Sequence, residues 1–379
     1  MRSTVFFMLV ILTFAACGGC LAGSALYTWS GENDFRKCTF SCASFSKQDG
    51  GVVFDKGVKA KAGEDSAVGV VETPVIVPSK RFMEIVPAWN SYTPEGAYMD
   101  VLAKVRIEGK WTRWYKIALY TTTDKPEPKK SYKDGDSLAH CPVDILIVKN
   151  NKRADALKLR YELKSTDGKN YPNLRLLAVN VDDPQGYKEN IPPEKSVWGT
   201  ELDVPYLCQL SVPGGNVWCS PTSTAMVLDY WAKKTNRPDL TVGITQAAKA
   251  CHDHRWGGTG NWVLNAAYAA EFKGMRGLVD RFSSVSQIEQ WIAKGVPVIV
   301  SLNHNRLTRG KSSSQGHLMV IRGFTKDGDP VFNDPWARLE KGEKLRKVYS
   351  RADLEYAWLG PEVPSKGAVY LIYPEDYKL

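Results

Sequence analysis

Alternation of apolar and polar positions predicts β-structure in the first half of the chain. The stretch 98–107 partly alternates and the stretch 111–120 is rich in aromatic residues, with the turn residues Glu108-Gly109-Lys110 between them. Such runs, bounded by turn signals, are typical of antiparallel strands joined by hairpins. Further strands are predicted at 143–148, 156–163 and 174–181. Together they indicate an all-β antiparallel sandwich over residues 81–183.

The second half of the chain combines helical and strand patterns. A largely apolar helix is predicted from Cys219 to Trp231, because Pro221 suits the first turn of a helix. Two more helices are predicted over 262–272 and 284–295, the second with Gln287 as the capping-box partner of its first residue. Strands are predicted at 296–302, 317–324, 330–333 and 368–373. Helices followed by an antiparallel sheet indicate an α+β domain.

Proline, glycine and acidic residues separate the two halves, as is typical of a linker. We therefore predict a multidomain protein. Its parts are a signal peptide (1–22), an unassigned segment whose contribution to the sandwich is left open (23–80), the sandwich (81–183), a linker (184–200) and the α+β domain (201–379).

The first 22 residues have the pattern of an export signal. Arg2 supplies a positive charge, and the apolar stretch 5–14 is too short to span a bilayer. Cys17 ends a segment that resembles a bacterial lipobox, in which the cysteine carries a lipid, while ordinary cleavage near Ala22 or Ala25 is the alternative. Both predict export, to the cell envelope as a lipoprotein or as a secreted protein. No later stretch has the length and apolar character of a transmembrane helix, so only a lipid anchor would contact the membrane.

Composition and charge narrow the class of protein. The chain has 379 residues, 43% of them hydrophobic and 24% charged, which is ordinary for soluble globular proteins. Its net charge of +9 favours anionic partners such as cell-wall polymers or lipid headgroups. No basic run is interleaved with aromatic residues, so we do not expect nucleic-acid binding.

Three residues in chain order suggest a thiol nucleophile and its partners. Cys219 lies where a helix begins, and the unpaired backbone N–H groups of a helix start favour the thiolate. His317 would stabilise that thiolate as imidazolium and then act as general acid. Asp334 would orient the imidazole, with the neighbouring Asn333 as the alternative. Gln209, ten residues before the cysteine, is the candidate donor to the oxyanion beside the backbone N–H of Cys219.

Four segments carry a family resemblance: Pro205-Tyr206-Leu207-Cys208-Gln209, Trp218-Cys219-Ser220-Pro221-Thr222-Ser223, Gly316-His317-Leu318-Met319-Val320-Ile321 and Phe332-Asn333-Asp334-Pro335. They resemble bacterial papain-like cysteine peptidases related to the double-glycine leader peptidases of bacteriocin exporters. The resemblance implies a papain-like fold and thiol peptidase activity, with Gln209, Cys219, His317 and Asp334 in the catalytic roles. The stretch 89–115 resembles the β-sandwich that precedes the peptidase in some exported relatives. Because no exporter transmembrane region or nucleotide-binding domain is recognised, leader-peptide processing during export is not inferred.

The cysteines and histidines outside these segments leave several options open. If Cys219 is a free thiol, five cysteines remain beyond the signal region, an odd number, and the pairings Cys38–Cys42 and Cys208–Cys251 stay open. Cys251-His252-Asp253-His254 suggests a metal site, but structural zinc sites usually have two paired ligand segments. We therefore predict neither a metal nor an organic cofactor. His304 is expected at the surface or the rim of a cleft, and His140 has no partner in the sequence.

The sequence thus predicts an exported cysteine peptidase that hydrolyses peptide or protein substrates through a Cys-His-Asp triad, a Gln oxyanion donor and an acyl-enzyme. One rival is an amidase or endopeptidase acting on cell-wall peptides. The other is a catalytically silent surface or glycan-binding protein, because exposed aromatic rings can stack on sugars. Strand spacing favours the sandwich core for these rings, which belong to Trp89, Trp111, Trp114 and Tyr115.

Overall fold

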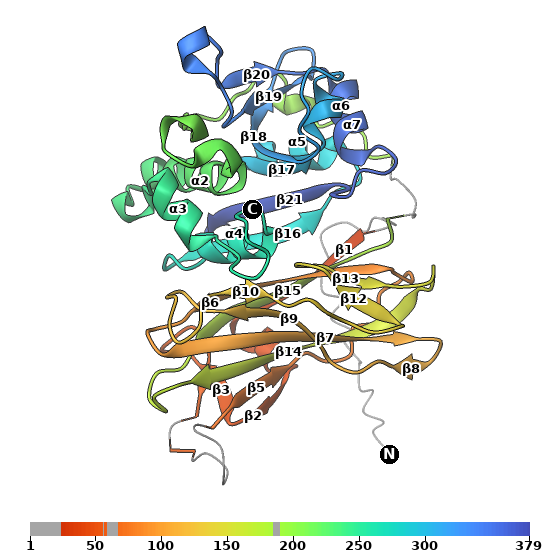
Figure 1. Cartoon of the computed structure of the whole chain (residues 1–379), viewed down its shortest axis with the longest axis vertical. Helices are drawn as coiled ribbons and strands as arrows, with labels where there is room; N and C mark the ends of the chain where they lie inside the picture. Colours follow the sequence, from red (N-terminus) through yellow and green to blue (C-terminus); the bar gives the residue numbers. More distant parts are fainter. Residues whose placement is uncertain (1–23, 56, 59–66, 185–189) are drawn as a thin grey trace, which may run out of the picture.

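The computed structural model describes residues 24–55, 57–58, 67–184 and 190–379 (Figure 1). The predicted signal peptide and lipobox, with Cys17, lie outside the described residues. Within them the protein is rich in β-structure and forms three antiparallel sheets. Two sheets come from residues 24–182, here called the N-terminal region, and the third comes from residues 190–379, the C-terminal region. No helix in the described part of the chain is long and apolar enough to cross a membrane.

The N-terminal region consists of two sheets and the short helix α1 (Gly31–Phe35). The first sheet has the order β11 (Asp134–Gly135), β12 (Ala139–Cys141), β13 (Leu146–Val148), β6 (Glu84–Tyr92), β15 (Asn173–Asp182), β4 (Gly51–Phe54) and β3 (Ala43–Ser46), with β1 (Ser24–Ser30) also paired to β15. The second has the order β10 (Lys130–Ser131), β9 (Tyr115–Tyr120), β7 (Ala97–Ile107), β14 (Ala154–Ser165), β5 (Gly69–Glu72) and β2 (Thr39–Ser41), with β8 (Lys110–Trp111) paired to β7. The segment before residue 80, unassigned from the sequence, therefore supplies strands to both sheets.

The strands expected at 98–107 and 156–163 are confirmed by β7 and β14. A two-residue turn joins β7 to β8, and both of its residues, Glu108 and Gly109, have positive φ, as a tight hairpin requires. The strand expected at 111–120 is divided into β8 and β9. The reason lies at Thr112, whose hydroxyl accepts the backbone N–H of Val105 at 3.2 Å and interrupts the ladder.

The aromatic residues of this region divide between core and surface. Trp89 and Tyr115 are fully buried, as expected for the core, whereas Trp111 is 37% exposed. The ammonium of Lys104 lies 5.1 Å from the ring of Trp111 and 4.7 Å from the ring of Trp114. Cation–π contacts therefore cover part of the exposed aromatic surface.

The C-terminal region places helices around one six-stranded sheet. The sheet has the order β16 (Met275–Arg281), β21 (Ala368–Pro374), β17 (Val298–Leu302), β18 (His317–Phe324), β19 (Pro330–Asn333) and β20 (Arg346–Val348). The helices are α2 (Cys219–Thr235), α3 (Ile244–Ala250), α4 (Trp262–Ala269), α5 (Val285–Ala293), α6 (His304–Leu307) and α7 (Arg351–Leu359). The bounds of β18 and β19 are those predicted, and the capping box of α5 at Ser284 and Gln287 is confirmed. Helix α4 ends before the predicted Phe272 because its last turn tightens, with Glu271 N–H donating to Tyr268 O at 3.0 Å.

Helix α2 packs on this sheet through polar as well as apolar contacts. The Ser223 hydroxyl donates to Leu318 O at 3.1 Å, and the Trp231 indole donates to Ile372 O at 2.7 Å. β18 and β19 are antiparallel neighbours, so the start of one and the end of the other lie at the same edge. The fold thereby brings the start of α2, the start of β18 and the end of β19 together.

The two regions meet where the eight-stranded sheet faces α4 and β16 (Figure 1). Asn90 of β6 donates to Gly277 O at 2.7 Å, and Arg281 forms a buried ion pair with Asp182 at 3.2 Å. A Cβ at Gly277 would lie 1.9 Å from Ala266 O, so only glycine lets β16 approach α4 this closely. Polar side chains therefore bond across a contact that also contains apolar residues of both regions.

Candidate active site

Cys219 is the first residue of α2 and has an acidified thiol. Burial opposes ionisation of the thiol, but a hydrogen bond to His317, the charge of His317 and the backbone N–H groups of Leu318 and Ser220 outweigh it. The pKa of Cys219 is therefore lowered. By contrast, burial raises the pKa of Cys38 to about 12 and also raises the pKa of the fully buried Cys251.

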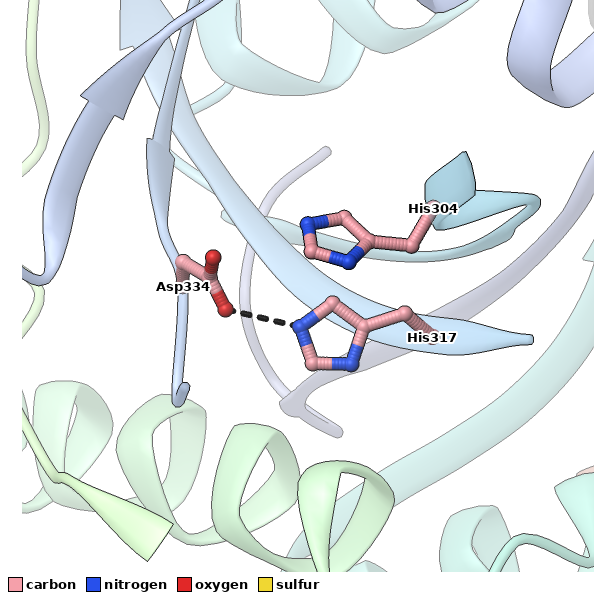
Figure 2. Close-up of side chains that lie close together, drawn as sticks. All are labelled: His304, His317 and Asp334. Atoms are coloured by element: carbon pink, nitrogen blue, oxygen red, sulfur yellow. Dashed lines mark hydrogen bonds and ion pairs between the residues drawn. The ribbon is translucent and has the colours of Figure 1, made fainter. Parts of the chain in front are cut away.

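His317 lies between the thiol and a buried carboxylate. Its Nε2 is 2.7 Å from Asp334 Oδ1 (Figure 2). Asp334 has no exposed surface. Burial disfavours the imidazolium, but the Asp334 and Cys219 charges and hydrogen bonds raise the pKa of His317 well above its usual range. The same imidazolium holds the pKa of Asp334 well below its usual range against the effect of burial.

The carboxylate of Asp334 is fully engaged. Oδ1 also accepts the backbone N–H of Trp336 at 2.9 Å, and Oδ2 accepts the Lys347 ammonium at 2.7 Å. Asn333 is turned elsewhere, since its amide donates to Val204 O and Pro205 O at 3.0 Å each. Of the two residues considered from the sequence, Asp334 is the one that contacts the imidazole.

Gln209 lies buried in a short 3₁₀ turn, Gln209–Ser211. Its Nε2 donates to Gly215 O at 2.7 Å, which leaves its second amide N–H for another acceptor. A Cβ at Gly215 would lie 1.7 Å from Gln209 O, so this close packing depends on glycine. Gln209 and Cys219 line the same cavity.

This cavity has a volume of about 750 Å³. Two parts of the chain line it: residues 209–219, here called the nucleophile segment, and residues 304–349, the histidine segment. The lining includes Gln209, Asn216, Val217, Cys219, His304, Ser312, His317, Trp336, Arg338, Glu343, Lys347 and Tyr349. The structure thus brings all four predicted site residues to one place, with Asp334 buried directly behind His317.

His304 is a part of the site that the sequence did not predict. It was expected at the surface or a cleft rim, but it lies in the cavity lining with 8% of its surface exposed. Its ring lies beside that of His317 (Figure 2), with the two ring centroids 4.7 Å apart. Its Nδ1 is 3.0 Å from the Ser312 hydroxyl. Burial, and then the charge of His317, lower the pKa of His304 to about 4, so it is neutral near pH 7. The pairing of Leu302 with His317 brings His304 to the site, because it places the start of α6 beside the start of β18. In the sequence, only the expected strands on either side of His304 pointed to this arrangement.

Two clusters were considered for metal binding. Ligand atoms of His304, His317 and Asp334 lie within 4.8 Å of one another, but both Asp334 oxygens already have partners, Oδ1 in His317 and Oδ2 in Lys347. In the sequence Cys251-His252-Asp253-His254, the carboxylate of Asp253 already accepts several hydrogen bonds, described below.

All six cysteines in the described residues are free thiols, so neither Cys38–Cys42 nor Cys208–Cys251 forms a disulfide.

Two family models match separate parts of the chain. Residues 201–360 match the Peptidase C39 like family, and residues 25–181 match the Peptidase C39 N-terminal domain. Among solved structures, a protein described as a C39-like peptidase from Bacillus anthracis is 17% identical with a TM-score of 0.34, covering 45% of this chain and 94% of its own. A family 89 glycoside hydrolase from Clostridium perfringens is 9% identical with a TM-score of 0.17, covering 78% of this chain and 25% of its own. No curated protein matches the chain.

Proposed function

We propose that this cysteine peptidase, whose residues 201–360 form a C39-like peptidase domain, hydrolyses peptide bonds through an acyl-enzyme formed on Cys219. The observation that carries the proposal is the position of His317, bonded to the thiol on one side and 2.7 Å from Asp334 on the other. This arrangement stabilises the thiolate–imidazolium pair that nucleophilic attack requires.

The proposed reaction has two halves. The Cys219 thiolate attacks the scissile carbonyl carbon, and the His317 imidazolium gives its proton to the leaving amine as the C–N bond breaks. Neutral His317 then takes a proton from water, which attacks the thioester and releases the acid and the thiolate. Asp334 holds the ring orientation throughout. The second N–H of Gln209 and the backbone N–H of Cys219 stabilise the oxyanion in both halves.

The same proposal covers the architecture. The two sheets of the N-terminal region are interpreted as a β-sandwich that includes the segment before residue 80. The helices and six-stranded sheet of the C-terminal region are interpreted as a papain-like α+β domain, with residues 184–200 as the connection. What supports this is the shared core of the strands and the start of α2 beside the start of β18.

Export is part of the proposal and rests on the N-terminal sequence pattern. The protein would act in the cell envelope, anchored through Cys17, or outside the cell. Its substrates would be peptides or proteins met there, including cell-wall peptides, and the N-terminal region would be the part available for wall contact.

The test is the rate of iodoacetamide labelling at Cys219 against pH, read by peptide mass spectrometry, together with hydrolysis of a peptide library. We expect a labelling midpoint well below the value of about 8.5 for a free thiol, lost in His317→Ala. Hydrolysis should vanish in Cys219→Ala. An ordinary thiol, indifferent to His317, would refute the proposal and favour a binding protein without catalysis.

A further inference from the structure

The loop between α3 and α4, residues 251–261, is held mainly by the N-terminal region. Arg255 donates to the Ser131 hydroxyl and to Pro142 O, both at 2.6 Å. The Lys129 ammonium donates to Ala250 O at 2.8 Å just before the loop, and Asp144 accepts the backbone N–H of Trp262 at 2.7 Å just after it. Both ends and the middle of the loop are therefore fixed from outside the C-terminal region.

Asp253 is the centre of this attachment. It is completely buried, and its Oδ1 accepts the backbone N–H of Ser131 at 3.1 Å across the interface. Within the loop, the same carboxylate accepts the backbone N–H of Trp256 at 3.0 Å and the Asn261 amide at 2.9 Å. Burial opposes its ionisation, yet these donors lower the pKa of Asp253. A buried carboxylate satisfied from both regions makes the loop conformation depend on their contact.

The far side of the loop contacts a residue that lines the cavity. The Thr259 hydroxyl donates to Val217 O at 3.3 Å, and Val217 lies two residues before Cys219 in the cavity lining. Asn265 of α4 donates to Thr259 O at 2.8 Å and also meets Thr224 of α2 at 3.4 Å. The loop thus braces the turn that carries Gly215 O, the acceptor for Gln209.

We infer that the N-terminal region positions the oxyanion side of the active site through the α3–α4 loop. The inference rests on the proposed peptidase function for its catalytic consequence. Asp253, Arg255 and Thr259 are positioning residues here, because none of them lines the cavity. The N-terminal region would then contribute to catalysis by positioning the oxyanion donors, in addition to any contact it makes with the envelope.

The choice of variants follows from this path. Arg255→Ala removes three hydrogen bonds across the interface, to the Ser131 hydroxyl, Ser131 O and Pro142 O, at a half-buried position. Thr259→Val removes only the hydroxyl that meets Val217 and keeps the shape of the side chain. Arg175→Ala is the matched control, since Arg175 also crosses the interface, to Ala270 O and to Glu375 at 2.7 Å, but does not touch the loop.

The full-length chain is measured in three ways: peptide hydrolysis, iodoacetamide labelling of Cys219, and hydrogen–deuterium exchange of residues 209–219. Alkylation by iodoacetamide forms no oxyanion, so displacement of the oxyanion donors leaves it unchanged. We expect Arg255→Ala and Thr259→Val to lower kcat/KM by about 10-fold to 100-fold, mainly through kcat, with labelling unchanged. Exchange in residues 209–219 should rise in both variants and stay at the wild-type rate in Arg175→Ala.

Unchanged exchange and kcat/KM in both loop variants would overturn the inference. An equal loss in Arg175→Ala would also overturn it, because the effect would then belong to docking of the regions in general. If the wild type hydrolyses no peptide, the proposed function fails, and the exchange data still decide whether the N-terminal region orders the nucleophile segment.

Discussion

The histidine segment and the nucleophile segment line one cavity but are held in place by different means. His317 begins β18 and Asp334 directly follows the adjacent strand β19, and β18 is hydrogen-bonded on both sides, to β17 and β19. The nucleophile segment contains short 3₁₀ turns and depends on the α3–α4 loop, whose anchors lie in another region of the chain. The acid–base pair is therefore fixed by local sheet structure, whereas the oxyanion donors are fixed by long-range contacts. Substitutions in the histidine segment should therefore alter both labelling of Cys219 and hydrolysis, whereas those in the nucleophile segment should lower hydrolysis alone.

The largest effect is expected at the histidine segment. Asp334→Ala leaves a buried imidazolium without its carboxylate, so the pKa of His317 falls and the thiolate pair is lost. We expect kcat/KM to fall by about 10³-fold and the labelling midpoint of Cys219 to move up in pH. Glu343→Gln, which alters another cavity carboxylate, is the control. An unchanged labelling curve in Asp334→Ala would show that the pair is not held by this carboxylate.

A smaller and different effect is expected at the nucleophile segment. Gln209→Ala removes one oxyanion donor and should lower kcat by about 10²-fold, since that is the usual cost of such a donor. Labelling of Cys219 should stay as in the wild type, because the thiolate pair is intact. Asn216→Ala, in the same cavity lining, serves as the control for a change of cavity shape. Loss of labelling together with hydrolysis would mean that Gln209 supports the fold rather than the oxyanion.

His304 offers a finer test of the histidine segment. Its ring lies 4.7 Å from that of His317 and is buried, and we expect it to limit the access of water to the ion pair. His304→Phe keeps a ring there, and we expect a change in kcat/KM of less than about threefold. His304→Ala admits water, and a drop of about tenfold is expected with a narrower pH range of labelling. Equal activity of the two variants, measured side by side, would rule out a covering role.

The smallest effect on catalysis is expected at Glu271, in the interface that supports the nucleophile segment. Burial raises its pKa to about 7, against the charge of Lys129 and the hydroxyl of Tyr120, which donates at 2.5 Å. A carboxyl whose pKa is raised on folding stabilises the fold below its unfolded pKa of about 4.3, and that contribution is lost as pH rises toward 7. Wild-type stability should therefore fall over this range by up to about 3 kcal/mol relative to Glu271→Gln. Urea unfolding of both proteins at pH 4.5 and 7.5 measures this difference. An equal change in the free energy of unfolding for both would contradict the raised pKa of Glu271.

Local signals predicted much of the fold and most of the site. Pro221 marks the start of α2, Ser284 and Gln287 define the cap of α5, and apolar runs define β18 and β19 to the residue. The strands before residue 80 were missed because they are short and gain stability from partners far along the chain, such as β15. His304 was missed for the same reason, since only the pairing of β17 with β18 brings it to His317. The bracing role of Asp253 depends on Ser131, 122 residues earlier, and no local pattern could indicate it.

Because Lys347 pairs with Asp334, the site holds two positive and two negative charges. Thiolate, imidazolium, carboxylate and ammonium sum to zero in the resting enzyme. In the acyl-enzyme the thioester and His317 are both neutral, and the remaining two charges still cancel. The chain as a whole carries a net charge of +9, yet the pocket passes through its catalytic cycle without a change of net charge. Ionic strength should therefore influence the capture of charged substrates far more than the rate of bond cleavage.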